Sequence, residues 1–240
     1  MEDWLLQPNH YLRLWNGTQA TLQLLGQAFV LGVALSLLVG VARLSKQRWI
    51  RGAALVYVEF ARGISSVILL FIMVIALPIL FGIRGASVMF WGSIALGINM
   101  GGYGAEIVRG AIQAIPRGQN EASIALNLSG TQRLRHVVLP QAMRIILPPM
   151  GNLTIEILKG TALVSVVGGI DLMRETQNLV STQLAAGVAG VTTLFVNVLL
   201  IYFVIAQVIN GLFRLAERAL ARRYEQRTGR RAVPVPEVAA

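Results

Sequence analysis

The sequence contains no cysteine, and only two histidines, His10 and His136, are present. The lack of cysteine excludes disulfide bonds, thiolate nucleophiles and cysteine-ligated metals. A zinc site needs more ligands than two histidines far apart in the chain can supply. We therefore expect no metal and no cofactor in this chain.

Charged residues are also scarce. They make up 13% of the 240 residues, whereas hydrophobic residues make up 55%, a balance unlike that of soluble domains. The apolar residues form long blocks without charge, and about 20 such residues are enough to cross a bilayer. The sequence therefore predicts an all-α integral membrane protein.

Five blocks are candidates for membrane spans, and an odd number of spans places the two termini on opposite sides of the membrane. Residues 1–17 would form an external segment, residues 18–213 a single transmembrane domain, and residues 214–240 a basic cytoplasmic tail with a disordered end. The predicted spans are residues 18–41, 63–83, 85–105, 145–170 and 184–212.

Basic residues are concentrated in three segments outside the predicted spans. Of the 21 Lys and Arg residues, 16 lie in the first connection, in the third connection (residues 109–144) and in the tail. Because cytoplasmic loops are rich in Lys and Arg, these segments should be cytoplasmic and the N-terminus external. The formal net charge of +10 does not indicate a nucleic-acid partner, since aromatic residues are not interleaved with the basic ones.

Gly97 and Gly101 form a G-x-x-x-G pair in the third predicted span. Small residues at this spacing let two helices approach closely in a membrane. Such a contact can lie within the chain or between two subunits, and we favour packing within the chain.

The third connection contains helix breakers around a short helix. Pro116 and Gly118 should break the preceding helix, and residues 119–128 resemble a short helix with apolar and small side chains on one face. Ser129 and Gln132 have the spacing of a capping box for another helix, which Pro140 should end. A short helix of this kind suits docking into a cleft on another protein, but an ordinary interfacial helix would show the same pattern.

The fourth predicted span carries two charges, Glu156 and Lys159. A charge in the middle of a membrane helix costs about 3 kcal/mol. The i, i+3 spacing places both side chains on one face, where an ion pair between them would orient the helix. Alternatively, this face lines a solute path, in which opposite charges would complement a zwitterion.

No phosphate-binding loop of the form G-x-x-x-x-G-K-[ST] is present, because neither of the two lysines, Lys46 and Lys159, follows a glycine. We therefore expect a subunit that is not an enzyme. Intramembrane hydrolysis would need a nucleophile with a base, paired aspartates or a metal, and the only aspartates, Asp3 and Asp171, lie outside the predicted spans. A structural or receptor-like membrane subunit without a transport path remains as the alternative to a transport subunit.

Several segments resemble the polar amino acid permeases, which are membrane subunits of ATP-binding-cassette (ABC) importers. The permease signature Glu-Ala-Ala…Gly…Ile-x-Leu-Pro is similar to Glu121-Ala-Ser, Asn127 and Val-Leu-Pro140 in this chain. The similarity covers roughly residues 17–220. It extends to Tyr57-Val-Glu-Phe-Ala-Arg-Gly63, Gly102-Tyr-Gly-Ala-Glu-Ile-Val-Arg-Gly110, Ile115-Pro-Arg-Gly118 and Leu158-Lys-Gly-Thr-Ala-Leu-Val-Ser165.

The resemblance implies the ABC type I importer permease fold, a five-helix core that dimerises around a transport path in the bacterial inner membrane. It implies three partners: a cytoplasmic ABC ATPase dimer that binds the ATP, a second permease copy or a sister permease, and an external solute-binding protein. Glu156, Lys159 and Thr161 become candidates for the path. The family's coupling helix, which docks on the ATPase, corresponds to Glu121, Ala122, Ser123, Ile124, Leu126, Asn127 and Gly130.

The sequence departs from the family pattern at several positions. Asn127 stands where Gly is usual, although Asn also tolerates a left-handed backbone. Residues 64–66 (Ile-Ser-Ser) replace a frequent Thr-Pro-Leu, which puts the family's bend there in doubt. Gly160 and Ala162 stand where Asp and Ser are common. Together with residues 125–127 and 151–153, these two positions resemble the branch that imports ectoine and hydroxyectoine.

Overall fold

The computed structural model describes residues 8–83, 85, 87–185 and 191–228, and all regular structure in these residues is helical. The predicted all-α class is confirmed. The end of the tail, for which the sequence predicts disorder, lies outside the described residues. The elements are α1 (Pro8–Ala42), α2 (Arg48–Gly63), α3 (Ser66–Phe71), η1 (Ile72–Ala76), α4 (Leu77–Leu80), α5 (Val88–Gln113), α6 (Arg117–Ala125), α7 (Gly130–Arg133), η2 (Leu134–Val138), α8 (Leu139–Thr161), η3 (Ala162–Val167), α9 (Leu172–Ala185) and α10 (Val191–Thr228).

Three helical stretches in the described part of the chain are long and apolar enough to cross a membrane: Pro8–Ala42, Gly130–Val167 and Val191–Arg222. A fourth is added if the bent pair Arg48–Gly63 and Ser66–Leu80 forms one span. α5, which contains most of the third predicted span, is not among them. Its sequence is rich in glycine and includes the polar Asn99, which lowers its hydropathy. The number of five spans therefore stays a prediction.

Two span boundaries differ from those predicted. α1 begins at Pro8, ten residues before the predicted start of the first span, so much of the predicted external segment is helical. The fifth predicted span begins in α9 and continues in α10, and residues 186–190 between them lie outside the described residues. The predicted spans do not include α9 as a separate helix: Asp171 before it is a common N-cap residue, but no capping box follows.

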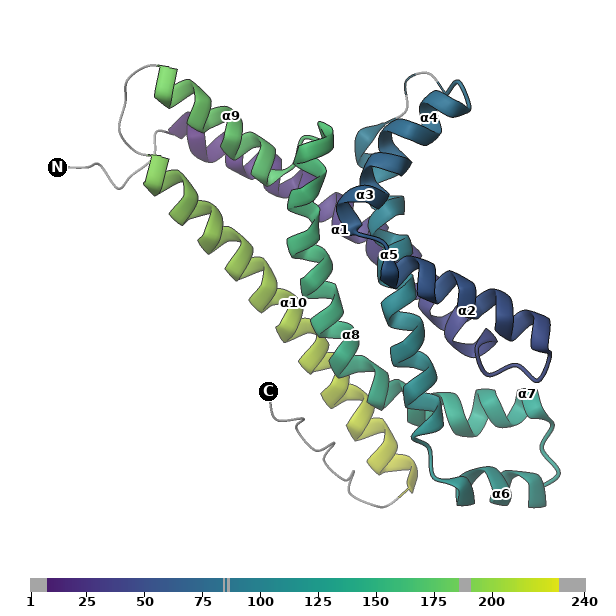
Figure 1. The fold of residues 1–240 in the computed structure, drawn as a ribbon. Coiled ribbons are helices and arrows are strands. Elements are labelled where there is room, and N and C mark those ends of the chain that lie inside the picture. The colour runs from purple at the N-terminus through teal and green to yellow at the C-terminus, as the bar shows by residue number, and fades with distance from the viewer. Residues whose placement is uncertain (1–7, 84, 86, 186–190, 229–240) are drawn as a thin grey trace.

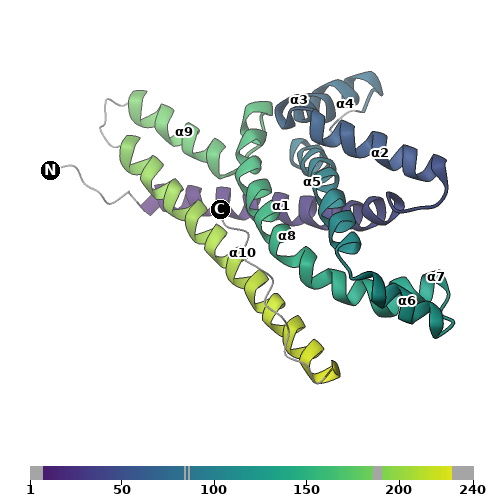
Figure 2. The ribbon, with the colours of Figure 1, turned by 60° about the horizontal axis from the view of Figure 1, so that its bottom comes forward.

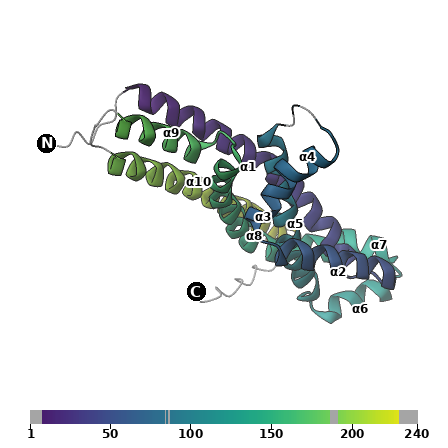
Figure 3. The same cartoon turned by 45° about the horizontal axis from the view of Figure 1, so that its top comes forward.

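The connections gather at two ends of the molecule. The α1–α2 connection, α6, α7 and the C-terminal part of α10 lie toward the bottom of Figure 1. α9 lies at the other end beside the first turns of α1 and α10, and Figures 2 and 3 show the same arrangement. We call these the basic end and the α9 end. The described segments that we predict to be cytoplasmic therefore lie together at the basic end.

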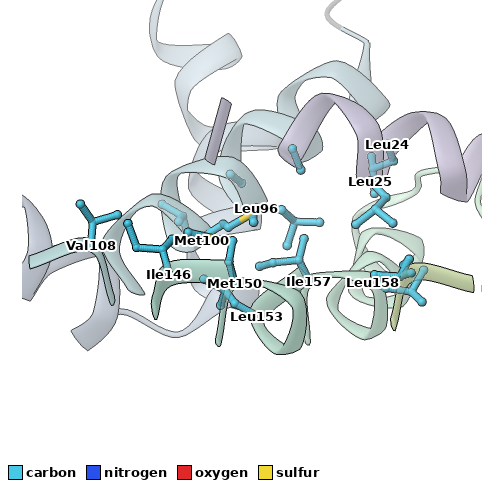
Figure 4. Packing of buried hydrophobic residues seen from close by; sticks show 14 of the residues in the cluster. Leu24, Leu25, Leu96, Met100, Val108, Ile146, Met150, Leu153, Ile157 and Leu158 are labelled. Carbon is cyan, nitrogen blue, oxygen red and sulfur yellow. The ribbon is translucent and has the colours of Figure 1, made fainter. Parts of the chain in front are cut away.

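The core lies where α1, α5 and α8 cross. α1 packs along α5, and α8 packs against both α5 and α10. Leu24, Leu96, Met100 and Leu158 are almost completely buried, and Figure 4 shows them among the apolar side chains of one cluster. Because lipid tails are as apolar as leucine, such a cluster stabilises a membrane protein mainly through close packing.

Glycines on α5 permit the close approach of α1 and α2. A Cβ atom at Gly97 would lie 2.9 Å from Leu31 Cδ2, and one at Gly101 would lie 2.5 Å from the Tyr57 hydroxyl. A Cβ atom at Gly104 would collide with the hydroxyl of Ser36 on α1. The prediction that the G-x-x-x-G pair packs within the chain is confirmed.

We expect Gly104→Ala to lower the stability of the protein by about 1–3 kcal/mol, the usual cost of overpacking a core. The matched control is Gly110→Ala on the same helix, where a Cβ atom would meet nothing within 4 Å. This control should be neutral or gain up to about 1 kcal/mol in helix propensity. Thermal unfolding of both variants in detergent would test the difference. Equal melting temperatures would contradict the tight contact with Ser36.

Two π-helical segments each accommodate a proline in a continuing helix. A proline ring collides with the carbonyl of residue i−4 and leaves it without its N–H donor. For Pro78 that residue is Val74, in the middle of the π segment η1. For Pro140 it is His136, in the middle of the π segment η2. The wider π turn gives the ring room. The prediction that Pro140 ends the helix is therefore wrong, since the helical stretch runs from Gly130 to Val167.

A bend of 104° separates α2 from α3. Ile64 and Ser65 lie at this point with extended backbone, at ψ angles of 141° and 132°. Two extended residues break the helix without any proline, so the bend exists despite the Ile-Ser-Ser sequence. The second predicted span, residues 63–83, corresponds to the α3–η1–α4 stretch that follows the bend.

Candidate functional site

The predicted docking segment forms a separate helix, α6, at the basic end (Figure 1). Pro116 is its N-cap residue, so Pro116 separates α6 from α5 as predicted, whereas Gly118 lies inside α6 and breaks nothing. Ser123 is the one buried residue of α6. Its hydroxyl donates a hydrogen bond to the Asn120 carbonyl oxygen at 2.7 Å. The rest of α6 is surface.

Apolar side chains extend from this surface. Ile124 is 59% exposed and Leu126 is 75% exposed, and the neighbouring Glu121 and Ala122 are exposed as well. Exposed apolar side chains that cluster on one helix indicate an interaction site. The geometry of α6 therefore fits docking on a partner protein.

A Schellman motif ends α6. The Leu128 N–H donates to the Ser123 carbonyl oxygen at 3.1 Å, and the Asn127 N–H donates to the Ile124 carbonyl oxygen at 2.8 Å. Asn127 has a φ angle of 56°, in the left-handed region. The prediction that Asn replaces Gly by adopting this conformation is confirmed.

The predicted capping box starts α7 directly afterwards. The Gln132 N–H donates to Ser129 Oγ at 3.3 Å, and the Ser129 N–H donates to Gln132 Oε1 at 2.9 Å. Gly130, the first residue of α7, is exposed. The residues that the resemblance assigns to coupling therefore lie together in α6, its left-handed turn and the start of α7.

Glu156 and Lys159 lie on an exposed face of α8, together with Asn152 one turn earlier. The ion pairs recorded for the described residues do not join Glu156 to Lys159. The interpretation as an internal ion pair therefore lacks a contact to support it. Both charges lie on the side of α8 that is not covered by its own subunit.

The depth of this face limits what can cover it. Glu156 lies roughly 20 Å before the end of the helical stretch Gly130–Val167, at a rise of about 1.5 Å per residue in α8 and about 2 Å in the 3-10 helix η3. This stretch is long and apolar enough to cross a membrane. A charge in contact with lipid at that depth costs about 3 kcal/mol. The face therefore suits a water-filled path or a polar surface of another subunit, and does not suit lipid.

Thr161 does not share that face. It is 0% exposed, and its hydroxyl donates to the Leu158 carbonyl oxygen at 2.7 Å. On its side of α8 lie the buried hydroxyl of Tyr202 and the carboxyl of Asp171. The structure thus separates Thr161 from Glu156 and Lys159, the two other residues predicted to line the path.

Several polar contacts join residues that are distant in the sequence, and local sequence patterns do not predict them. Arg43 contacts Glu106 at 3.1 Å at the basic end, and Arg13 contacts Glu175 at 3.0 Å at the α9 end. Asp171 is 0% exposed, and this burial raises the pKa of its carboxyl. In the sequence, a lone aspartate after Gly-Gly-Ile shows no sign that its side chain is buried.

The chain is similar to known proteins over most of its length. A model of the family described as binding-protein-dependent transport system inner membrane component matches residues 32–222. The probable amino-acid ABC transporter permease protein y4tF of Sinorhizobium fredii (strain NBRC 101917 / NGR234) is 39% identical over 87% of this chain and 87% of its own length. The glutamine transport system permease protein GlnP of Escherichia coli (strain K12) is 34% identical over 86% of this chain and 92% of its own length.

The fold is also found in solved structures. A crystal structure of an amino acid ABC transporter with histidines matches at a TM-score of 0.79 and 32% identity, over 91% of this chain and 99% of that one. An inward-facing structure of the MetNI methionine ABC transporter matches at a TM-score of 0.73 and 21% identity, which supports the fold alone. The chain belongs to the family of binding-protein-dependent transport system inner membrane components.

Proposed function

We propose that this chain is the translocation subunit of an ATP-driven importer of polar amino acids or amino-acid-like compatible solutes. The observation that carries the proposal is the exposed face of α8, where Glu156 and Lys159 lie at membrane depth without an ion pair between them. An acidic and a basic side chain on one polar face complement the ammonium and carboxylate groups of an amino acid. The relatives named for amino acid and glutamine transport support this substrate class.

Coupling to ATP hydrolysis would occur at the basic end. We assign it to α6 and its left-handed turn, because their exposed apolar side chains need a partner surface. That partner would be a cytoplasmic ABC ATPase dimer, which would bind the ATP. A second permease, identical or a sister chain, would face the charged side of α8 across the path. An external solute-binding protein would deliver the solute.

Within this class we propose ectoine or hydroxyectoine as the solute. The support is the sequence resemblance at Gly160, Ala162 and residues 151–153. Ectoine is zwitterionic, so it would use the same two charges on α8. Excess unlabelled ectoine should compete with labelled ectoine for uptake much better than glutamine does. Stronger competition by glutamine would contradict ectoine as the solute, but would still agree with a polar amino acid as the solute.

The proposed function itself is tested by reconstitution. The chain would be combined in proteoliposomes with the ATPase, any sister permease and the binding protein encoded beside its gene. Uptake of labelled solute that requires ATP is the expected result. Binding of the partners without any uptake would instead favour a structural or receptor-like subunit.

The orientation can be tested with single cysteines, because the chain has none of its own. We expect a membrane-impermeant thiol reagent to label Asn9→Cys in intact cells and to leave Gly118→Cys and Thr228→Cys unlabelled until the cells are opened. The reason is the concentration of Lys and Arg at the basic end. Labelling of Gly118→Cys but not of Asn9→Cys would reverse the proposed topology.

A further inference from the structure

Four helices meet in a buried polar cluster at the α9 end of the molecule. The cluster consists of Thr21 on α1, Thr161 at the end of α8, Asp171 before α9 and Tyr202 on α10, and we call it the four-helix junction. Thr21, Thr161 and Asp171 are each 0% exposed. Figure 3 shows α1, α9 and α10 side by side at this end.

The connection from α8 to α9 is held tightly in the four-helix junction. η3 ends at Val167, and its C-cap residue Gly168 has a φ angle of 88°. A Cβ atom at Gly169 would collide with Val164. Asp171 then caps α9, because its Oδ1 accepts a hydrogen bond from the Arg174 N–H at 2.9 Å.

α1 fixes the first residue of α9. The Leu172 N–H donates to Thr21 Oγ1 at 3.0 Å, and a Cβ atom at Gly17 would lie 2.8 Å from Leu172 Cα. Neither contact leaves space for α9 to shift toward α1. The start of α9 is therefore fixed by backbone and side chain together.

Oδ1 of Asp171 caps α9, and the second carboxylate oxygen, Oδ2, takes no part in the cap. This Oδ2 and the Tyr202 hydroxyl are both buried, and neither has a hydrogen-bond partner among the described residues. The two groups are neighbours, and the Tyr202 hydroxyl also lies beside Thr21 and Thr161. A buried carboxylate oxygen without a donor is costly, and the neighbouring Tyr202 hydroxyl is a donor able to satisfy Asp171 Oδ2.

The four-helix junction lies behind the charged face of α8. Thr161 follows Lys159 by two residues, which corresponds to about 3 Å along the helix, but lies on the opposite side of it. Any rotation of this last turn of α8 would move Lys159 and Thr161 together. The packing of the buried Thr161 beside Tyr202 therefore bears on the direction in which the charged face points.

We propose that Asp171 and Tyr202 are positioning residues, which hold the last turns of α8 so that Glu156 and Lys159 face away from the interior of the subunit. The inference rests on the proposed function for its meaning in transport, but not for its geometry. A role of Asp171 as a helix cap alone would not involve Tyr202. Removal of the Tyr202 hydroxyl should therefore alter α8 if Asp171 and Tyr202 position it, and should leave α8 unchanged if Asp171 only caps α9.

Two single-cysteine reporters on α8 measure this rotation in the full chain in membranes. Leu158 is 1% exposed, and the adjacent Lys159 is exposed. The reporters are Leu158→Cys and Lys159→Cys, and the readout is the ratio of their labelling rates with N-ethylmaleimide. Because the readout is a ratio of rates, it does not depend on the yield of folded protein. Ile157→Cys, at 3% exposure, replaces the buried reporter if Leu158→Cys is not inserted.

Tyr202→Phe should raise the labelling of the buried reporter relative to Lys159→Cys several-fold. Asp171→Ser should have the same effect, because serine retains the cap of α9 but has no second oxygen for Tyr202. The matched control is Tyr57→Phe, which removes a hydroxyl that donates to the Ile98 carbonyl oxygen at 2.8 Å far from the four-helix junction. The control should leave the ratio unchanged.

An unchanged ratio in both Tyr202→Phe and Asp171→Ser would overturn the positioning role. An equal rise in Tyr57→Phe would do the same, since it would indicate general loosening. Uptake by Tyr202→Phe, with cysteine-free protein, separates this inference from the proposed function. A raised ratio with unchanged uptake would leave the positioning role in place and would contradict the role of the α8 face in transport.

Discussion

Glu156→Gln is expected to reduce solute uptake by about tenfold to a hundredfold while the yield of folded permease stays nearly unchanged. A hydrogen bond to a charged group contributes about 1.5–3 kcal/mol, and each 1.36 kcal/mol corresponds to about tenfold in rate. Folding should tolerate the change, because the structure contains no ion pair between Glu156 and Lys159 that the substitution would break. The measurements are uptake in proteoliposomes and the monodisperse yield after detergent extraction.

Lys159→Met and the double variant complete a double-mutant cycle. If both side chains contact the solute, each single change impairs uptake and the double change does not restore it. The matched control is Thr154→Val, which lies on the buried side of the same helix, where the hydroxyl bonds within the helix to the Met150 carbonyl oxygen at 2.8 Å. It should retain uptake. Recovery of both uptake and yield in the double variant would reduce Glu156 and Lys159 to a structural pair.

Glu121→Lys is expected to abolish association with the ATPase and, with it, ATP-dependent uptake. Glu121 is exposed on α6 beside Ile124 and Leu126, so the substitution should leave the fold intact. Charge reversal at the centre of an interface places like charges together or removes a pair, at a cost of several kcal/mol. Co-purification with the tagged ATPase is the measurement.

The control for this variant adds a positive charge at the same end of the molecule but outside α6. Gln47, in the α1–α2 connection, is exposed, and its side chain makes no capping hydrogen bond to α2. Gln47→Lys should retain both association with the ATPase and solute uptake. If Glu121→Lys also co-purifies with the ATPase at the normal ratio, the coupling assignment of α6 is lost.

Local patterns predicted local structure well. The capping box at Ser129 and Gln132 formed as expected, and Asn127 adopted the left-handed backbone. Each of these features depends on residues within a few positions of one another. Local rules could therefore predict the turn and the helix start after the candidate docking segment, whereas its docking role follows from the family resemblance.

The same local rules failed where the wider structure offers another solution. Pro140 does not end its helix, because a π turn around His136 gives the proline ring room. The bend after α2 forms without proline, through extended backbone at Ile64 and Ser65. A proline therefore does not always end a helix: widened turns accommodate Pro78 and Pro140, and Pro148 and Pro149 lie inside α8.

Long-range contacts between polar side chains could not be predicted. Glu156 and Lys159 are spaced to pair, yet the structure leaves both on an exposed face, while Asp171 and Tyr202 meet across 31 positions of sequence. Periodicity places a residue on one side of a helix but does not reveal what covers that side. The division of α8 into a charged face and a buried face became visible only once its neighbours were placed.

If the charged face of α8 lines a water-filled solute path, the labelling of a single cysteine on that face tests this most directly. Asn152 is exposed on this face, one turn from Glu156, and is uncharged, so Asn152→Cys should preserve the charges that bind the solute. In the assembled transporter, we expect a hydrophilic thiol reagent to label Asn152→Cys quickly, and to label it more slowly while solute and ATP drive turnover. Labelling by lipid-soluble reagents alone, with no effect of solute, would contradict a water-filled path at this face.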